Sequence, residues 1–187
     1  MSVHRCLPAL SRIAAISFVV LAIGPAPDAF GSERKAHRHG AGTLNLAIEG
    51  RNVEAELEAP GADVVGFEHA AASDAEKQAV AKAADQLRAG ATLFVFPEAA
   101  GCRLIESEVE SPLLDEKHHD HKGSDTDAHA EFHAHYHFRC DRPGQLTHLD
   151  TTYFETFPAA QALTVRMITA GGQSARQLTP KTARLKF

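Results

Sequence analysis

The chain has 187 residues, with 19 Lys and Arg against 24 Asp and Glu, and therefore a formal net charge of −5. This acidic balance argues against nucleic-acid binding, which depends on basic residues that neutralise phosphates. It suits a metal cation better, and 12 histidines supply the commonest protein metal ligand.

The first 31 residues have the pattern of a secretory signal peptide. Arg5 and Arg12 form a basic start, residues 13–23 form an apolar run, and the segment Ala29-Phe30-Gly31 follows with small residues at its first and last positions. A spanning helix needs about 20 apolar residues, so we expect cleavage rather than an uncleaved anchor. Residues 32–187 would remain as a single domain with 17 Lys and Arg and 23 Asp and Glu, a net charge of −6. No membrane insertion is expected after cleavage.

Two alternating runs follow the start of this domain. Residues 44–48 and 53–57 have the two-residue period of half-buried strands, and Gly50 to Asn52 can form the turn between them. The sequence predicts a hairpin whose solvent side is acidic, with Glu54, Glu56 and Glu58 in alternation.

One long helix is expected at about 74–89. Ser73 and Glu76 have the spacing of a capping box, in which two otherwise unpaired amides are satisfied reciprocally. Helix-forming residues continue from there, and Gly90 is a typical C-terminal stop.

The rest of the chain predicts short strands. They are expected at 93–96, 102–109, 132–138, 146–154, 163–169, 174–178 and 183–187. Residues 112–130 are rich in His and Asp and poor in apolar side chains, so we expect a mobile loop insert there. The predicted class is α+β, mostly antiparallel β as a sheet, sandwich or partial barrel, with the one helix packed on it.

The segment from Glu131 to Phe138 gives the sharpest functional signal. Side chains of a strand alternate between faces, so His133, His135 and His137 share one face with Glu131. Same-face neighbours lie about 6.5 to 7 Å apart, which lets two imidazoles, but not all three, converge on one Zn²⁺. Further ligands would come from a neighbouring strand, the loop or water. The alternative is a solvated polar face without a metal.

Other histidines give weaker signals. The expected loop carries His118, His119, His121 and His129, which suit a capture site of modest affinity or a merely solvated insert. His37 and His39 can supply two imidazole ligands, or they can be residues at the start of the domain that bind no metal. The isolated His69 and His148 more often have structural roles.

Cys102 and Cys140 are the two cysteines that remain after residue 31. In an exported protein they predict a disulfide, which the chain-entropy model credits with about 4 kcal/mol for a loop of this size. The alternative is a pair of thiolate metal ligands.

Several short motifs in order resemble the ZrgA-like zinc uptake family of Gram-negative bacteria, across nearly all of residues 32–187. These motifs are His37–Gly40 running into Leu44–Ala47, Gly66–His69, Ala100–Cys102, Tyr136–Cys140 and Phe154–Pro158. The resemblance implies a periplasmic protein that binds zinc and assists its acquisition. It also implies that His37, His39 and His69 are candidates for a fixed site beside the strand histidines.

We therefore expect a zinc-binding accessory protein rather than an enzyme, with a zinc transporter component as a possible recipient of the ion. A copper or nickel chaperone or buffer is the first alternative, because imidazole suits those ions too. A metal-dependent hydrolase is the second, although neither a His-Glu-x-x-His motif nor a Gly-x-Ser-x-Gly motif occurs. An exported structural domain with an incidental His face is the third.

Overall fold

The computed structural model describes residues 40–114 and 130–187. The expected signal peptide, His37, His39 and most of the expected loop, with His118, His119, His121 and His129, lie outside these residues. None of the helices in the described ranges has the length and apolar content needed to cross a bilayer.

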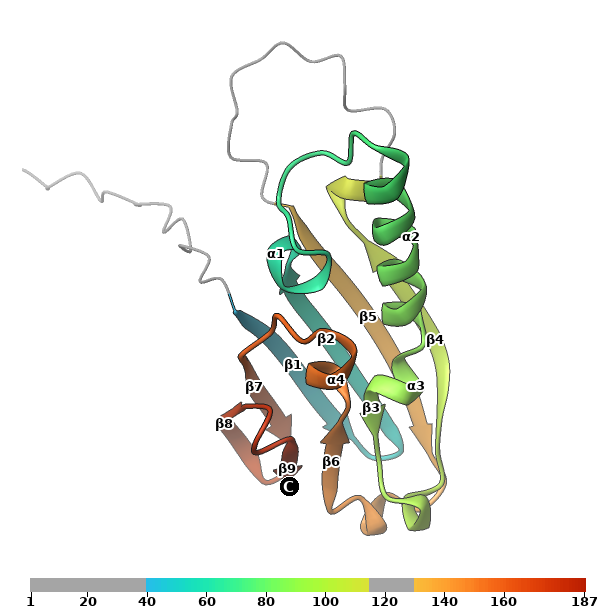
Figure 1. The fold of residues 1–187 in the computed structure, drawn as a ribbon. Helices are drawn as coiled ribbons and strands as arrows, with labels where there is room; N and C mark the ends of the chain where they lie inside the picture. The colour runs from blue at the N-terminus through green and yellow to red at the C-terminus, as the bar shows by residue number, and fades with distance from the viewer. Residues whose placement is uncertain (1–39, 115–129) are drawn as a thin grey trace, which may run out of the picture. The chain divides into compact units, whose positions relative to one another are not determined.

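Nine strands and four α-helices make up the described residues, with short 3₁₀ turns between some of them (Figure 1). The strands are β1 (Ala41–Glu49), β2 (Asn52–Pro60), β3 (Phe94–Val95), β4 (Cys102–Glu110), β5 (Glu131–Cys140), β6 (His148–Thr151), β7 (Ala162–Thr169), β8 (Gly172–Leu178) and β9 (Arg184–Lys186). The helices are α1 (Gly61–Val64), α2 (Asp74–Arg88), α3 (Gly90–Leu93) and α4 (Tyr153–Thr156).

Six strands form the main sheet, in the order β4-β5-β2-β1-β7-β8. Its pairs are antiparallel except for β1 and β7, which run parallel. A smaller antiparallel sheet has the order β3-β6-β9. The sheets stay open rather than closing into a barrel, so the α+β class with mostly antiparallel strands is confirmed.

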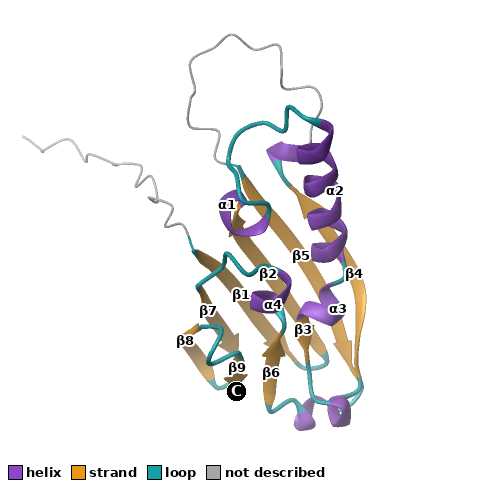
Figure 2. Ribbon diagram, in the orientation of Figure 1, coloured by secondary structure: helices purple, strands orange, loops and turns teal. Residues whose placement is uncertain are grey.

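The helices and the small sheet cover one face of the main sheet (Figure 2). Apolar side chains from the strands meet them in one continuous core, led by the fully buried Tyr136, Phe132, Phe138, Tyr153, Phe94 and Phe157. We call the opposite side of the main sheet the open face. Its side chains are the exposed members of each alternating strand, which are mostly polar on β2, where Glu54 and Glu56 lie between buried neighbours, and include the apolar Ile168 on β7.

Helix α2 begins with the predicted capping box. The Glu76 amide donates to Ser73 Oγ at 3.2 Å, and the Ser73 amide donates to Glu76 Oε2 at 2.8 Å. The hydrogen bond that the Ser73 amide donates to the carboxylate holds the pKa of Glu76 below its ordinary value. The helix ends at Arg88 and turns through Ala89 into α3, so the expected boundary at Gly90 is confirmed within one or two residues.

Tyr136 ties β5 to the helical layer. Its hydroxyl donates to the carbonyl oxygen of Leu87 at 2.9 Å, and its ring meets Phe94 edge to face at 5.5 Å. Burial raises the pKa of the Tyr136 hydroxyl, which keeps it a neutral donor. A Cβ on Gly90 would overlap the Tyr136 ring, so glycine allows α3 to approach the strand closely.

Cys102 and Cys140 form a disulfide, as predicted. They are direct cross-strand partners at one end of the β4–β5 pair. Because β4 is an edge strand with β5 as its neighbour in the sheet, the disulfide anchors one end of this edge to the sheet.

Replacing both cysteines, Cys102→Ser with Cys140→Ser, should lower the free energy of unfolding by about 2–5 kcal/mol. The loss should be accompanied by faster amide hydrogen exchange along β4, because this edge would then be held by its ladder hydrogen bonds alone. Urea unfolding and hydrogen exchange of the oxidised wild type and the variant measure both effects. Equal stability and equal exchange would show that the disulfide does not anchor the edge.

Candidate metal centre

Strand β5 places three histidines on the open face. Phe132, Ala134, Tyr136 and Phe138 of this strand are buried, which fixes the alternation of its side chains. His133, His135 and His137 therefore point to the other side, as the sequence predicted, with 42, 49 and 30% of their side-chain surface exposed.

Glutamates from both neighbouring strands lie opposite these histidines. On β2, Glu54 pairs with His137, Glu56 with His135 and Glu58 with His133. On β4, Glu106 pairs with His137, Glu108 with His135 and Glu110 with His133. Adjacent strands are about 4.8 Å apart, so each imidazole sits between two carboxylates in its own row. We call these nine residues the Glu–His ladder.

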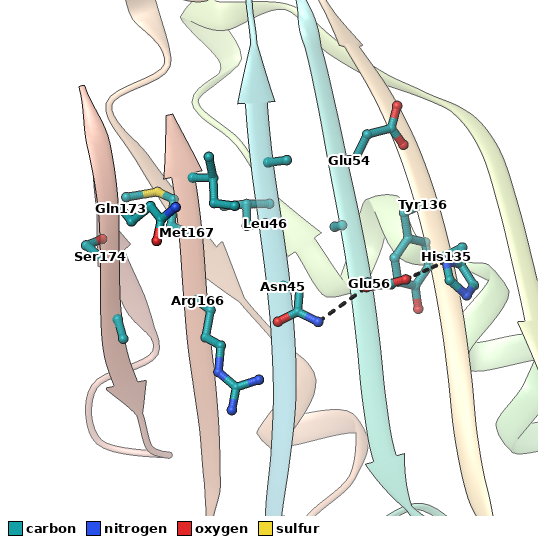
Figure 3. A pocket seen from close by; sticks show the side chains of 14 residues that line it. Asn45, Leu46, Glu54, Glu56, His135, Tyr136, Arg166, Met167, Gln173 and Ser174 are labelled. Carbon is teal, nitrogen blue, oxygen red and sulfur yellow. Dashed lines mark hydrogen bonds and ion pairs between the residues drawn. The ribbon is translucent and has the colours of Figure 1, made fainter. Parts of the chain in front are cut away.

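The middle row has the most contacts. His135 Nδ1 lies 3.5 Å from Glu56 Oε1, while the Asn45 side-chain amide donates to Glu56 Oε2 at 3.3 Å (Figure 3). The Glu56 carboxylate is thus oriented from both sides.

The row formed by His137 with Glu54 and Glu106 contains a ring nitrogen that makes no hydrogen bond among the described residues. Nε2 of His137 is buried and makes no hydrogen bond within the described residues, although Glu54 Oε1 lies 3.6 Å away. A buried nitrogen that lacks a partner is unfavourable, and a metal ion would satisfy it. Imidazole nitrogens and carboxylate oxygens, the donor types of the ladder, are among the ligands that zinc takes in proteins.

The third row differs from the other two. His133 Nε2 lies 3.7 Å from Glu131 Oε2 of its own strand. Glu131 was expected to share the face of the histidines, and this contact confirms that it lies beside them. It adds a carboxylate at the end of the ladder.

The ladder does not form a closed metal site. No group of three or more potential ligands in residues 40–114 and 130–187 converges closely enough to hold an ion. The histidines are held by the core on which β5 packs, whereas the glutamates of β4 are exposed side chains that can change rotamer. A metal ion would therefore draw exposed carboxylates toward imidazoles whose strand is held in place by the core.

Two other histidines lie apart from the ladder. His69, between α1 and α2, stacks on Phe67 with ring centroids 4.9 Å apart, and its Nε2 is 3.8 Å from Glu76. His148 on β6 lies 3.6 Å from Asp150, whose carboxylate binds Arg184 through both oxygens. These hydrogen bonds from Arg184 hold the pKa of Asp150 below its ordinary value. Neither histidine belongs to a ligand cluster within the described residues.

The strand register reveals ligand candidates that sequence reasoning missed. Glu54, Glu56 and Glu58 were assigned only to a solvent side, and Glu106, Glu108 and Glu110 were not assigned a role. Their alternation is visible in the sequence. What the sequence does not contain is which strands lie on either side of the histidines, and this decides their role.

A groove of about 800 Å³ extends from the ladder across the open face (Figure 3). Glu54, Glu56 and His135 line one side of it with their neighbours Ala55 and Tyr136, and residues of β1, β7 and β8 line the remainder. Arg166 of β7 is the one Lys or Arg in its lining. The groove thus joins the acidic ladder to a single positive charge.

A comparison with protein families matches residues 36–187 to a family described as ZrgA family zinc uptake protein. The chain therefore belongs to this family, which confirms the resemblance seen in the motifs. The match includes all of the ladder. A search of curated proteins finds no match.

Proposed function

Starting from membership of a zinc uptake family, we propose that the chain is a periplasmic zinc-binding protein that assists zinc acquisition and is not an enzyme. The zinc would be held by the Glu–His ladder. The observation that carries this proposal is the register, which places a glutamate on both sides of each of three histidines.

The ligand chemistry of each row suits zinc. Zinc binds imidazole nitrogen and carboxylate oxygen at about 2.0–2.2 Å, usually with four ligands. One row supplies up to three protein ligands, and water or a second imidazole can supply the fourth. Two neighbouring histidines are about 6.5–7 Å apart along β5, within reach of one ion.

The open arrangement favours exchange of the ion. Ordering each glutamate costs up to about 1.5–2 kcal/mol of side-chain entropy, which lowers affinity relative to a closed site. Partial exposure of the ladder also leaves the ion accessible to an incoming ligand. Both properties suit a protein that receives zinc and passes it to a transport system.

Other segments would extend this role. Residues 1–31 would direct export as a signal peptide, and 32–187 would form one zinc-binding domain. The Cys102–Cys140 disulfide fits an oxidising compartment such as the periplasm. We propose that the His/Asp-rich segment at about 112–130 captures zinc weakly, and that His37, His39 and His69 provide a separate site.

Substituting the three ladder histidines, His133→Gln, His135→Gln and His137→Gln, should remove the tightest zinc-binding phase in calorimetry. Their imidazoles are the fixed nitrogen donors of the site. The variant should also lose the zinc-induced rise in melting temperature, because only binding to the folded state stabilises it.

The matched control is His148→Gln, which removes a histidine beside a carboxylate elsewhere in the fold. It should bind zinc as the wild type does. Copper and nickel titrations of the same proteins test the alternative cargo. A triple variant that keeps the tight phase would place the site outside the ladder.

Zinc binding should weaken as the pH falls from 7.5 to 5. Free imidazole titrates near pH 6.5 and must be neutral to bind a metal, so affinity should drop about 30-fold for each histidine ligand. Glutamate carboxyls protonate mostly below this range, near pH 4.3. Titrations at pH 7.5, 6 and 5 measure the effect, and an affinity unchanged at pH 5 would make carboxylates the principal ligands.

A further inference from the structure

We propose that the groove on the open face binds a small dicarboxylate together with zinc, with Arg166 holding the carboxylate that is remote from the metal. This inference rests on the proposed zinc site of the ladder. It assigns a ligand class to the part of the groove that the ladder does not occupy.

The first support is the position of Arg166. It lies in the same transverse row as the middle of the ladder, because Asn45 pairs with Glu56 on one side and with Arg166 on the other. The row therefore runs from His135 through Glu56 and Asn45 to Arg166. The backbones that carry Glu56 and Arg166 are two strand spacings, about 10 Å, apart.

The second support is that Arg166 has no protein partner. Its side chain is exposed, and it makes no hydrogen bond or ion pair within the described residues. Arg51 and Arg103 both bind Asp141, and Arg184 binds Asp150, whereas the exposed Arg139 of β5 resembles Arg166 in having no ion pair among the described residues. Arg166 differs from Arg139 in that it lines the groove. A guanidinium presents a planar set of donors that matches a carboxylate in a bidentate manner.

The third support is charge. The positive charge of Arg166 would repel a zinc ion in the same groove and attract an anion. A zinc ion on Glu56 and His135 would have a coordination position left for an outside ligand. An anion with two carboxylates can fill this position with one group and bind Arg166 with the other.

The size of the groove fits this ligand class. Its volume of about 800 Å³ is within the range of small-molecule sites, which is about 300–1,000 Å³. Its lining combines polar groups with the apolar Ala47, Ile168 and Ala175, which can contact the carbon chain of an organic acid. A small inorganic anion would make no contact with this apolar part of the groove.

The test uses glutarate as the dicarboxylate and butyrate as its monocarboxylate counterpart. Both are titrated by calorimetry into the mature protein, with and without saturating zinc. Zinc-loaded wild type should bind glutarate at least about tenfold more tightly than the Arg166→Gln variant does, because the variant lacks the charged bidentate contact. Butyrate binding should be equal in the two proteins, and zinc-free protein should bind glutarate weakly.

Arg176→Gln is the matched control, since Arg176 lies on the adjacent strand β8 and outside the groove lining. It should behave as wild type, which separates a local contact from a change in net charge. Arg166→Lys should give intermediate glutarate binding, because the charge remains but the bidentate geometry is lost.

The outcomes distinguish this inference from the proposed function. Zinc binding with equal glutarate affinity in wild type and Arg166→Gln would overturn the groove proposal and leave the zinc site in place. Failure of zinc to bind the ladder in the absence of glutarate would overturn both.

Discussion

The two-residue alternation of β5 is the constraint on which the rest of the structure depends. Phe132, Tyr136 and Phe138 on its inner side fill the centre of the core. A slip of one residue would expose these rings and bury the histidines, and each exposed ring would cost about 1.5–3 kcal/mol before the polar groups are counted. The core thus fixes the direction of three imidazoles that do not contribute to it.

Strand register then places glutamates on both sides of these imidazoles. β5 lies between β2 and β4, and both strands present glutamates on the open face in phase with the histidines. The β2 side is in the interior of the sheet, while the β4 side is an edge that the disulfide anchors at one end. The ladder therefore combines histidines on a strand held by the core with exposed glutamates on an edge strand, a combination that supports the proposed reversible capture of zinc.

Much of this fold could be predicted from the sequence, where local patterns decide the outcome. The capping box fixed the start of α2, and the alternation from Glu131 to Phe138 gave both faces of β5. The prediction for 146–154 was partly wrong. The strand stops at Thr151 because its hydroxyl accepts from the Tyr153 amide and donates to the Leu93 carbonyl oxygen, and the chain then turns into α4.

The site could be predicted only in part, because non-local pairing decides it. The histidines could be identified from their spacing. The parallel pairing of β1 with β7, and the position of β5 between β2 and β4, cannot be predicted from any local sequence pattern. Glu106, Glu108 and Glu110 were missed for this reason. The same holds for Arg166, whose position in the row of His135 follows from the pairing of β2 with β5 and of β1 with β7, strands that are distant in sequence.

The position of bound zinc tests the central claim most directly. Crystals of residues 32–187 grown with zinc at neutral pH should show anomalous scattering at the zinc edge over the β2–β5–β4 part of the open face. The ion should lie about 2.0–2.2 Å from an imidazole nitrogen of His133, His135 or His137 and from a glutamate oxygen of the same or the adjacent row. Ordered zinc bound elsewhere in the chain, with none on the ladder, would contradict the account.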